Sequence, residues 1–206
     1  MLRKDGLETE TSLSNILIGT ECGLIYIVDQ SGSKIILKTK LPSIPHLIAT
    51  SGCYDIEYNI FIATRDNIIF IIRNGELSSL QIEIPFKIFG IIKTPKSLII
   101  GRADATVHSY NQDGHKNFGF GLPAELTCIE AIEIMTYPLF SGYALGLKNG
   151  EVRIYSERVL NFVYKFSEPV HCIKFGNYSN FGKTFIFITE SGGLIAKKLR
   201  NIDLDV

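Results

Sequence analysis

The sequence predicts an all-β protein, an incomplete β-propeller of about four and a half four-stranded blades. Three observations predict this fold. Short apolar runs and polar turns recur with a period of about 40 residues. Prolines stand before one strand in most repeats, a position that tolerates the loss of a backbone donor. No segment shows sustained helical periodicity with capping residues.

Five hairpins form the first element of the repeat. Each has an apolar run that ends in a small residue, a polar turn and an alternating strand. The five segments read "LIGTECGLIYIVD", "FIATRDNIIFIIR", "IIGRADATVHSYN", "ALGLKNGEVRIYS" and "FITESGGLIAKKL". Their equivalent turn positions, spaced 44, 38, 45 and 43 residues apart, are Gly23, Asn67, Ala105, Gly150 and Gly193. This spacing is typical of propeller blades.

Asn149 and Gly150 form the clearest of these turns. Asn-Gly between two strand-like segments favours a two-residue hairpin loop, in which both central residues have positive φ. We therefore expect positive φ at both residues.

Each repeat continues with a second turn, an outer strand and a crossing to an inner strand. The second turns read "DQSGSK", "RNGELS", "NQDGHK" and "SER", and the outer strands read "KIILKTKL", "SLQIEI", "KNFGFGL" and "VLNFVYKF". The prolines before the inner strands are Pro45, Pro85, Pro123 and Pro169. The segment "ELTCIEAIEIM" is the best helical candidate, but its place in the repeat predicts an inner strand.

The repeats divide residues 1–206 into blade units at about 1–41, 42–84, 85–122, 123–166 and 167–206. Trp is absent, so these are not ordinary WD40 repeats. The first unit lacks an inner strand, unless "MLRK" is its remnant, and the last lacks an outer strand. Either the ends meet in a small five-bladed ring or the chain is part of a larger one. Expressed alone, we expect the chain to be poorly soluble or oligomeric, because exposed strand edges promote association.

Charge and hydropathy exclude some classes of partner. Lys+Arg and Asp+Glu both number 21, so the formal net charge is zero and gives no electrostatic reason to expect nucleic acid or an anionic membrane surface. The N-terminal residues "MLRKDGLETETS" lack a signal-peptide core, and no apolar run approaches the ~20 residues of a membrane helix. These features predict a soluble, intracellular protein.

The four cysteines predict reduced thiols. Cys22, Cys53, Cys128 and Cys172 lie far apart, with no C-x-x-C pair. Cys128 and Cys172 share a repeat position with Leu47. Because free Cys behaves as a small hydrophobe, we expect both to be buried in inner strands rather than to serve metal or redox chemistry.

The sequence predicts no catalytic residue, no cofactor site and no metal site. His46 and His171 share a repeat position and would face a central channel, but a structural role is favoured because no helical metal-site spacing or H-E-x-x-H motif occurs. The segment "FGFGLPAE" lacks the third glycine of a dinucleotide fingerprint, and no G-x-S-x-G motif is present.

Several segments resemble the Bardet–Biedl syndrome protein 1 family. They are "LPSIP", "SGCYDIEY", "GLKNGEVRIY", "FGNY" and "GGLIAKKL", in the family's order, and the similarity runs from about residue 1 to residue 200. The resemblance implies the later blades of a seven-bladed N-terminal propeller. The family's early blades and C-terminal domain are missing, so we expect a fragment or a truncated gene model.

The resemblance also implies a function. The family is a subunit of the BBSome, a coat-like complex that carries membrane proteins into and out of cilia, and an Arf-like GTPase in its GTP form recruits it through this propeller. The implied partners are therefore other BBSome subunits, that GTPase and membrane-protein cargo. The implied locations are the cytoplasm, the cilium and its base, with peripheral membrane association only through the complex.

In the family the GTPase meets the region where the first and last blades join. We therefore expect partner contacts from the last unit, at Glu190, Ser191, Gly192, Lys197, Lys198 and Arg200. Two alternatives remain open: a scaffold propeller of another coat complex, and a propeller enzyme or metal-binding propeller that uses channel residues such as His46 and His171.

Overall fold

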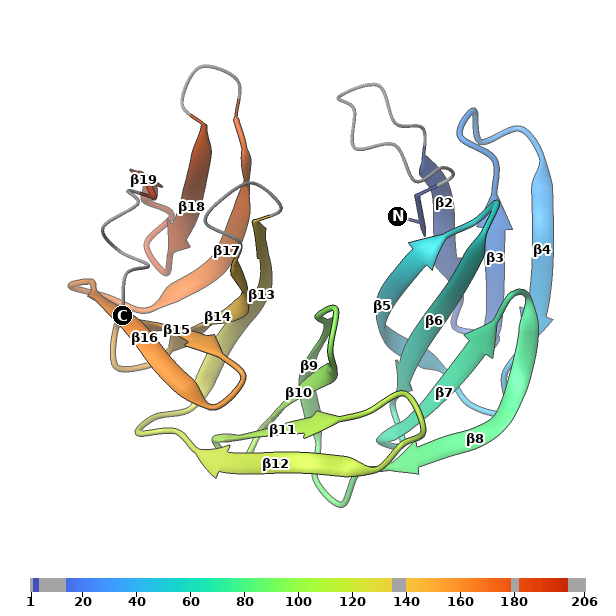
Figure 1. The fold of residues 1–206 in the computed structure, drawn as a ribbon, viewed down its shortest axis with the longest axis horizontal. Helices are drawn as coiled ribbons and strands as arrows, with labels where there is room; N and C mark the ends of the chain where they lie inside the picture. Colours follow the sequence, from blue (N-terminus) through green and yellow to red (C-terminus); the bar gives the residue numbers. More distant parts are fainter. Residues whose placement is uncertain (1, 4–13, 135–139, 179–181, 200–206) are drawn as a thin grey trace. The chain divides into compact units, whose positions relative to one another are not determined.

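The computed structural model describes residues 2–3, 14–134, 140–178 and 182–199, and every regular element among them is a β-strand (Figure 1). Two compact units, residues 1–93 and 94–206, are described separately. The division falls inside the predicted blade unit 85–122, and the predicted blade boundaries stay a prediction. No helix among the described residues is long and apolar enough to cross a membrane.

The first unit is built on one sheet of eight strands in the order β4-β3-β2-β1-β5-β6-β7-β8. The strands are β1 (Leu2–Arg3), β2 (Ser14–Gly19), β3 (Leu24–Val28), β4 (Ile35–Lys40), β5 (Pro45–Cys53), β6 (Glu57–Thr64), β7 (Ile68–Arg73) and β8 (Glu76–Glu83), followed by β9 (Ile88–Lys93). β1 pairs antiparallel with β2 and parallel with β5. Leu2–Arg3, within the "MLRK" segment, thus occupies the inner-strand position that the first repeat otherwise lacks.

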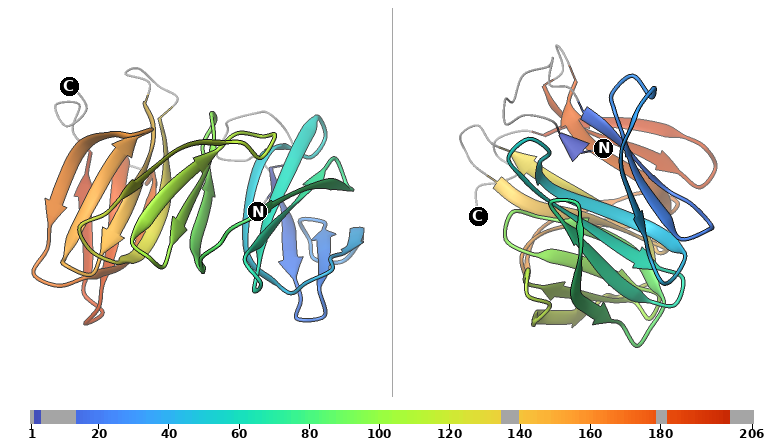
Figure 2. Two further views of the ribbon diagram at one scale, coloured as in Figure 1. Left: turned by 90° about the horizontal axis from the view of Figure 1, so that it is seen from below. Right: turned by 90° about the vertical axis from the view of Figure 1, so that its right-hand side faces the viewer.

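The second unit contains three groups of antiparallel strands, which Figure 2 shows from two further sides. The first group is β10 (Leu98–Arg102), β11 (Thr106–Tyr110) and β12 (Lys116–Gly121). The second is β13 (Leu126–Ile134), β14 (Phe140–Leu147), β15 (Glu151–Ser156) and β16 (Val159–Lys165), and the third is β17 (Val170–Asn177), β18 (Lys183–Thr189) and β19 (Leu194–Lys198). β13 covers most of "ELTCIEAIEIM", the best helical candidate in the sequence, and confirms that this segment is the inner strand of its repeat.

Aromatic and β-branched side chains form the core between the last two sheets. Ile132 and Ile154 from one sheet pack with Phe185 and Phe187 from the other. Tyr164 meets Phe185 edge-on at a ring-centroid distance of 6.2 Å. Such aromatic pairs add about 0.5–1.5 kcal/mol beyond the area they bury. Phe and Tyr therefore fill the space between sheets in a chain that has no Trp.

A left-handed residue recurs in the turn between the second and third strand of each repeat. The positive φ values are 74° at Gly23, 62° at Asn67, 56° at Ala105 and 81° at Gly150, which are four of the five equivalent turn positions of the repeat. In the last repeat the left-handed residue is Gly192, with φ of 88°, and not Gly193. The prediction was therefore wrong by one residue there.

One hydrogen bond recurs with this left-handed residue. In four repeats its carbonyl oxygen accepts the N–H of the residue that directly follows the outer strand. The four donor–acceptor pairs, 2.8 to 3.0 Å long, are Leu41 to Gly23, Ile84 to Asn67, Leu122 to Ala105 and Phe166 to Gly150. This hydrogen bond joins the turn to the end of the outer strand in each of the four repeats.

The prediction of positive φ at both Asn149 and Gly150 was wrong, because only Gly150 is left-handed. Three residues separate β14 from β15, and the Gly150 N–H bonds the Leu147 carbonyl. A three-residue loop favours a type I turn followed by one left-handed residue. The two-residue turn with both φ positive occurs at Asn74 and Gly75, between β7 and β8.

Three inner strands share an irregularity at the same repeat position. The register of β5, β13 and β17 shifts between Pro45 and Leu47, between Leu126 and Cys128, and between Val170 and Cys172. A bulge places one extra residue in the strand and re-aims side chains. The structure thereby confirms that Leu47, Cys128 and Cys172 are equivalent.

The expectation that Cys128 and Cys172 are buried was wrong: both are half-buried, although both are free thiols as expected. They follow bulges, where the regular alternation of inward and outward side chains is interrupted. The Cys128 thiol lies 3.3 Å from the Val170 carbonyl oxygen, to which it donates. Burial raises the pKa of Cys128 to about 11, which keeps the thiol protonated at neutral pH.

Replacing Gly150 with Val should destabilise the protein by about 1 kcal/mol or more, because a β-branched residue is strained at positive φ. A Cβ at this position would also lie 2.6 Å from the Phe166 carbonyl oxygen. Gly32 is the matched control, since its φ is 74° but a Cβ there meets nothing within 4 Å. Chemical denaturation should show a larger loss for Gly150→Val than for Gly32→Val, and equal losses would contradict the close approach.

Replacing Ala105 with Gly should stabilise the protein by up to about 1 kcal/mol, because Ala105 holds a φ of 56° that glycine adopts without a Cβ penalty. The same denaturation measurement reports the change. A loss of stability in Ala105→Gly would show that the left-handed conformation at this turn is wrong.

Candidate partner-binding surface

The turn between β18 and β19 carries three of the predicted partner-binding residues, Glu190, Ser191 and Gly192, all exposed. Thr189 folds the turn: its hydroxyl oxygen accepts the Gly193 N–H at 3.0 Å, and its carbonyl accepts the Gly192 N–H at 3.0 Å. Ser and Thr hydroxyls commonly stabilise turns in this way, because the hydroxyl oxygen accepts a backbone N–H in place of a carbonyl oxygen.

Glu168, on the connection between β16 and β17, holds the turn in place. Its carboxylate accepts the Ser191 hydroxyl at 2.6 Å and the Ser191 N–H at 3.1 Å. The Glu190 N–H donates to the Pro169 carbonyl at 2.9 Å. The Ser191 hydroxyl, followed by the side chain of Thr189, lowers the pKa of Glu168. The exposed turn is therefore anchored and presents a defined shape.

His171 and Glu190 form a loose pair at the edge of this surface. Their closest atoms, Nε2 and Oε1, lie 3.7 Å apart, and both side chains are more than half exposed. Such a pair contributes little to stability because water screens it. His171 is thus an exposed surface residue beside the predicted partner-binding turn.

The structure separates the predicted basic residues. Lys197 is half-buried, with its ammonium 4.8 Å from the Tyr164 ring centroid and 5.3 Å from that of Phe166. A cation over an aromatic face is stabilised there. Lys198 lies on the opposite, exposed face of β19, because successive strand residues alternate. Arg200 lies outside the described residues.

An apolar pair on the exposed face of β18 and β19 was missed by the sequence reasoning. Ile188 and Leu194 are cross-strand partners, with 40% and 70% of their surface exposed. Ala196 and Lys198 lie on the same face of β19. Strand alternation places Leu194, Ala196 and Lys198 on the face of β19 opposite to Lys197. The sequence does not say which of the two faces is exposed, because that depends on the packing. This surface, formed by Glu190 to Gly192, Ile188, Leu194 and Lys198, is called the β18–β19 surface below.

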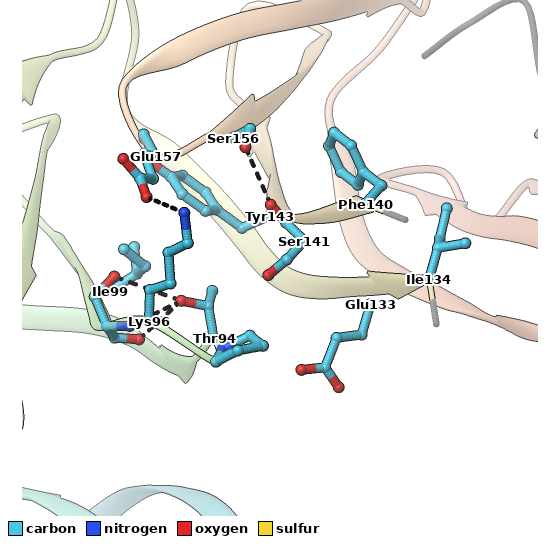
Figure 3. A pocket seen from close by; sticks show the side chains of 13 residues that line it. Thr94, Lys96, Ile99, Glu133, Ile134, Phe140, Ser141, Tyr143, Ser156 and Glu157 are labelled. Atoms are coloured by element: carbon cyan, nitrogen blue, oxygen red, sulfur yellow. Dashed lines mark hydrogen bonds and ion pairs between the residues drawn. The ribbon is translucent and has the colours of Figure 1, made fainter. Parts of the chain in front are cut away.

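A cavity of about 480 Å³ lies elsewhere in the second unit (Figure 3). Lys96 reaches Glu157 at 2.9 Å on one side, and Glu133 lies apart from this pair. The Tyr143 hydroxyl donates to the Glu157 carbonyl, and burial raises the pKa of Tyr143. These contacts join Lys96 and Tyr143 to Glu157 and hold the wall of the cavity together.

The two histidines considered for metal binding fall in different units, His46 on β5 and His171 on β17, and both are exposed. Within the described ranges, no group of three or more His, Cys, Asp or Glu side chains is arranged to hold a metal ion.

Acidification should release the β18–β19 turn from Glu168. The lowered pKa means that the charged contact is present above the ordinary glutamate pKa and is lost as pH falls through the lower folded value. The amide resonance of Ser191, followed by NMR, should titrate below the ordinary glutamate range and should not titrate in Glu168→Gln. A midpoint at or above the ordinary value would contradict the contact.

Comparison with known proteins gives the family. The family model described as "Ciliary BBSome complex subunit 1" matches residues 1–73. BBSome complex member BBS1 of Homo sapiens is 31% identical over 198 residues, and that of Mus musculus is 30% identical over the same length. Each match covers 96% of this chain and 33% of the relative, so the chain spans about a third of the length of these relatives.

Two solved structures show the same fold. Crystal structures of BBS1N in complex with ARL6DN, one soaked with lead and one with mercury, each give a TM-score of 0.93 at 31% identity. They cover 98% and 100% of this chain, which spans 66% and 62% of theirs. The fold is therefore that of a partial β-propeller, and the chain belongs to the BBS1 family.

Proposed function

We propose that the chain is part of a non-enzymatic subunit of the BBSome, in which the propeller is a protein-interaction scaffold. The observation that carries this proposal is the TM-score of 0.93 to BBS1N, which was crystallised in complex with ARL6DN. A rigid sheet scaffold that presents loops suits such a role. The proposed partners are other BBSome subunits, an Arf-like GTPase in its GTP form and ciliary membrane-protein cargo.

The proposed setting is ciliary trafficking of membrane proteins. The protein would work in the cytoplasm, at the ciliary base and in the cilium, and would reach the ciliary membrane peripherally through the complex. A scaffold propeller of another coat complex is the alternative, and recovery of BBSome subunits with the protein from ciliated cells would separate the two.

We place the GTPase contact at the β18–β19 surface. Its anchored turn, its exposed apolar pair Ile188 and Leu194, and the exposed Lys198 give the apolar centre and charged rim that protein interfaces have. Lys197 supports this surface from behind through its contact with Tyr164.

Reversing Lys197, Lys198 and Arg200 to Glu in the full-length protein should weaken capture by the GTPase locked in its GTP state, with an effect that shrinks at high salt, because rim charges act mainly through the association rate. Lys198→Glu alone should reproduce most of that electrostatic loss, since Lys198 is exposed. Lys116→Glu, an exposed change on β12, is the matched control.

Pull-down of the GTPase, with thermal melting to confirm folding, measures the effect. Unchanged capture by the folded triple variant, or an equal loss in Lys116→Glu, would remove the β18–β19 surface from the proposal.

A further inference from the structure

A small basic cavity lies in the first unit, far along the chain from the β18–β19 surface. It has a volume of about 320 Å³ and is lined by His46, Thr64, Arg65, Asn67, Lys87 and Ile88. His46, Arg65 and Lys87 are exposed, so the imidazole and the two cationic groups are accessible to a partner. All six residues belong to one compact unit.

The fold itself brings these groups to the cavity. The register of β5 shifts between Pro45 and Leu47, which makes His46 the extra residue of the bulge. Bulges commonly re-aim a side chain toward a site. Arg65 opens the β6–β7 turn, and its N–H donates to the Ile44 carbonyl at 3.0 Å, which holds the turn against the start of β5.

Asn67 supplies an oriented amide. Its φ of 62° belongs to the recurring left-handed position, and its carbonyl accepts the Ile84 N–H. Its side-chain Oδ1 accepts the Ile88 N–H at 3.1 Å. With the oxygen used in this way, the amide NH2 is the group that the Asn67 side chain offers to a ligand, and it is a donor.

The acidic groups lie in a neighbouring cavity of about 430 Å³, which includes Asp66 and Glu83 in its lining. Asp66 accepts the hydroxyls of Ser43 at 2.6 Å and Thr64 at 2.5 Å, and these bonds lower its pKa and keep it ionised. Asn67 lines both cavities. The carboxylates of Asp66 and Glu83 thus line the neighbouring cavity, and the cationic Arg65 and Lys87 line the first.

A carboxylate of the chain already pairs with one of the cations that line this cavity. Glu21, on the β2–β3 turn, places Oε1 at 2.8 Å from the Arg65 guanidinium. The Glu21 side chain is 83% exposed, so the pair is a surface contact that a stronger acceptor can displace at little cost. Glu21 therefore indicates the chemistry that the cavity accepts.

We propose that the cavity lined by His46, Arg65, Asn67 and Lys87 binds a carboxylate side chain from an acidic segment of a partner protein, with Glu21 as its intrachain competitor. The incoming carboxylate accepts hydrogen bonds from the Asn67 amide and the Arg65 guanidinium, the exposed Lys87 adds positive charge, and His46 lines the cavity beside them. This surface is independent of the proposed GTPase contact.

The probe is a fluorescein-labelled octapeptide of alternating Glu and Ser, compared with the same peptide carrying Gln, in fluorescence anisotropy with the full chain. The Glu peptide should bind more tightly than the Gln peptide, and added salt should weaken it. Arg65→Glu and Lys87→Glu should each weaken binding roughly fivefold. Lys34→Glu, an exposed change in the β3–β4 turn, should leave binding unchanged.

Glu21→Gln gives the sharpest result, because removing the competitor should strengthen binding while the mere loss of a surface charge pair would not. Equal binding of the Glu and Gln peptides, an unchanged or weaker affinity in Glu21→Gln, or an equal loss in Lys34→Glu would overturn the proposal. Displacement of the peptide by inorganic phosphate as readily as by free glutamate would also overturn it, in favour of a general anion site. GTPase capture should be unchanged in Lys87→Glu, which separates this proposal from the proposed function.

Discussion

The left-handed residue in the turn between the second and third strand of each repeat is the constraint on which the fold depends. It closes the hairpin, and in four repeats its carbonyl accepts the N–H of the residue directly after the outer strand, at Leu41, Ile84, Leu122 and Phe166. One backbone conformation thus sets both the inner hairpin and the end of the sheet. Asn67 and Ala105 hold this conformation although neither is glycine. The protein therefore accepts local strain at these two residues to keep the turn geometry.

The same turns position the two surfaces that we propose bind partners, the β18–β19 surface and the basic cavity of the first unit. Three of these turns rest on the connection that precedes the inner strand of their repeat, through the N–H groups of Arg65, Lys148 and Glu190. At the β18–β19 turn this arrangement presents Ser191 and Glu190 beside exposed apolar side chains, and at the β6–β7 turn it presents Arg65 beside a basic cavity. One repeated backbone plan thus holds both the proposed GTPase contact and the proposed carboxylate site.

Much of this architecture follows from the sequence, because turn chemistry and strand alternation are local. Period, inner strands and four left-handed positions are readable from residues such as Asn67 and Gly150. The shift from Gly193 to Gly192 is not, since either glycine of a pair can adopt positive φ. Tertiary packing decides which face of a strand is covered. On β19 the Lys197 ammonium lies over Tyr164, whereas Leu194, on the opposite face, is exposed.

Native-state hydrogen exchange at the amides of Leu41, Ile84, Leu122 and Phe166 tests the recurring turn most directly. These four N–H groups lie directly after the outer strands, where strands commonly fray. The structure predicts that all four are protected, because each donates to the carbonyl of a left-handed turn residue. Exchange of these amides at the rate of an unstructured chain, while the strand interiors stay protected, would contradict the account.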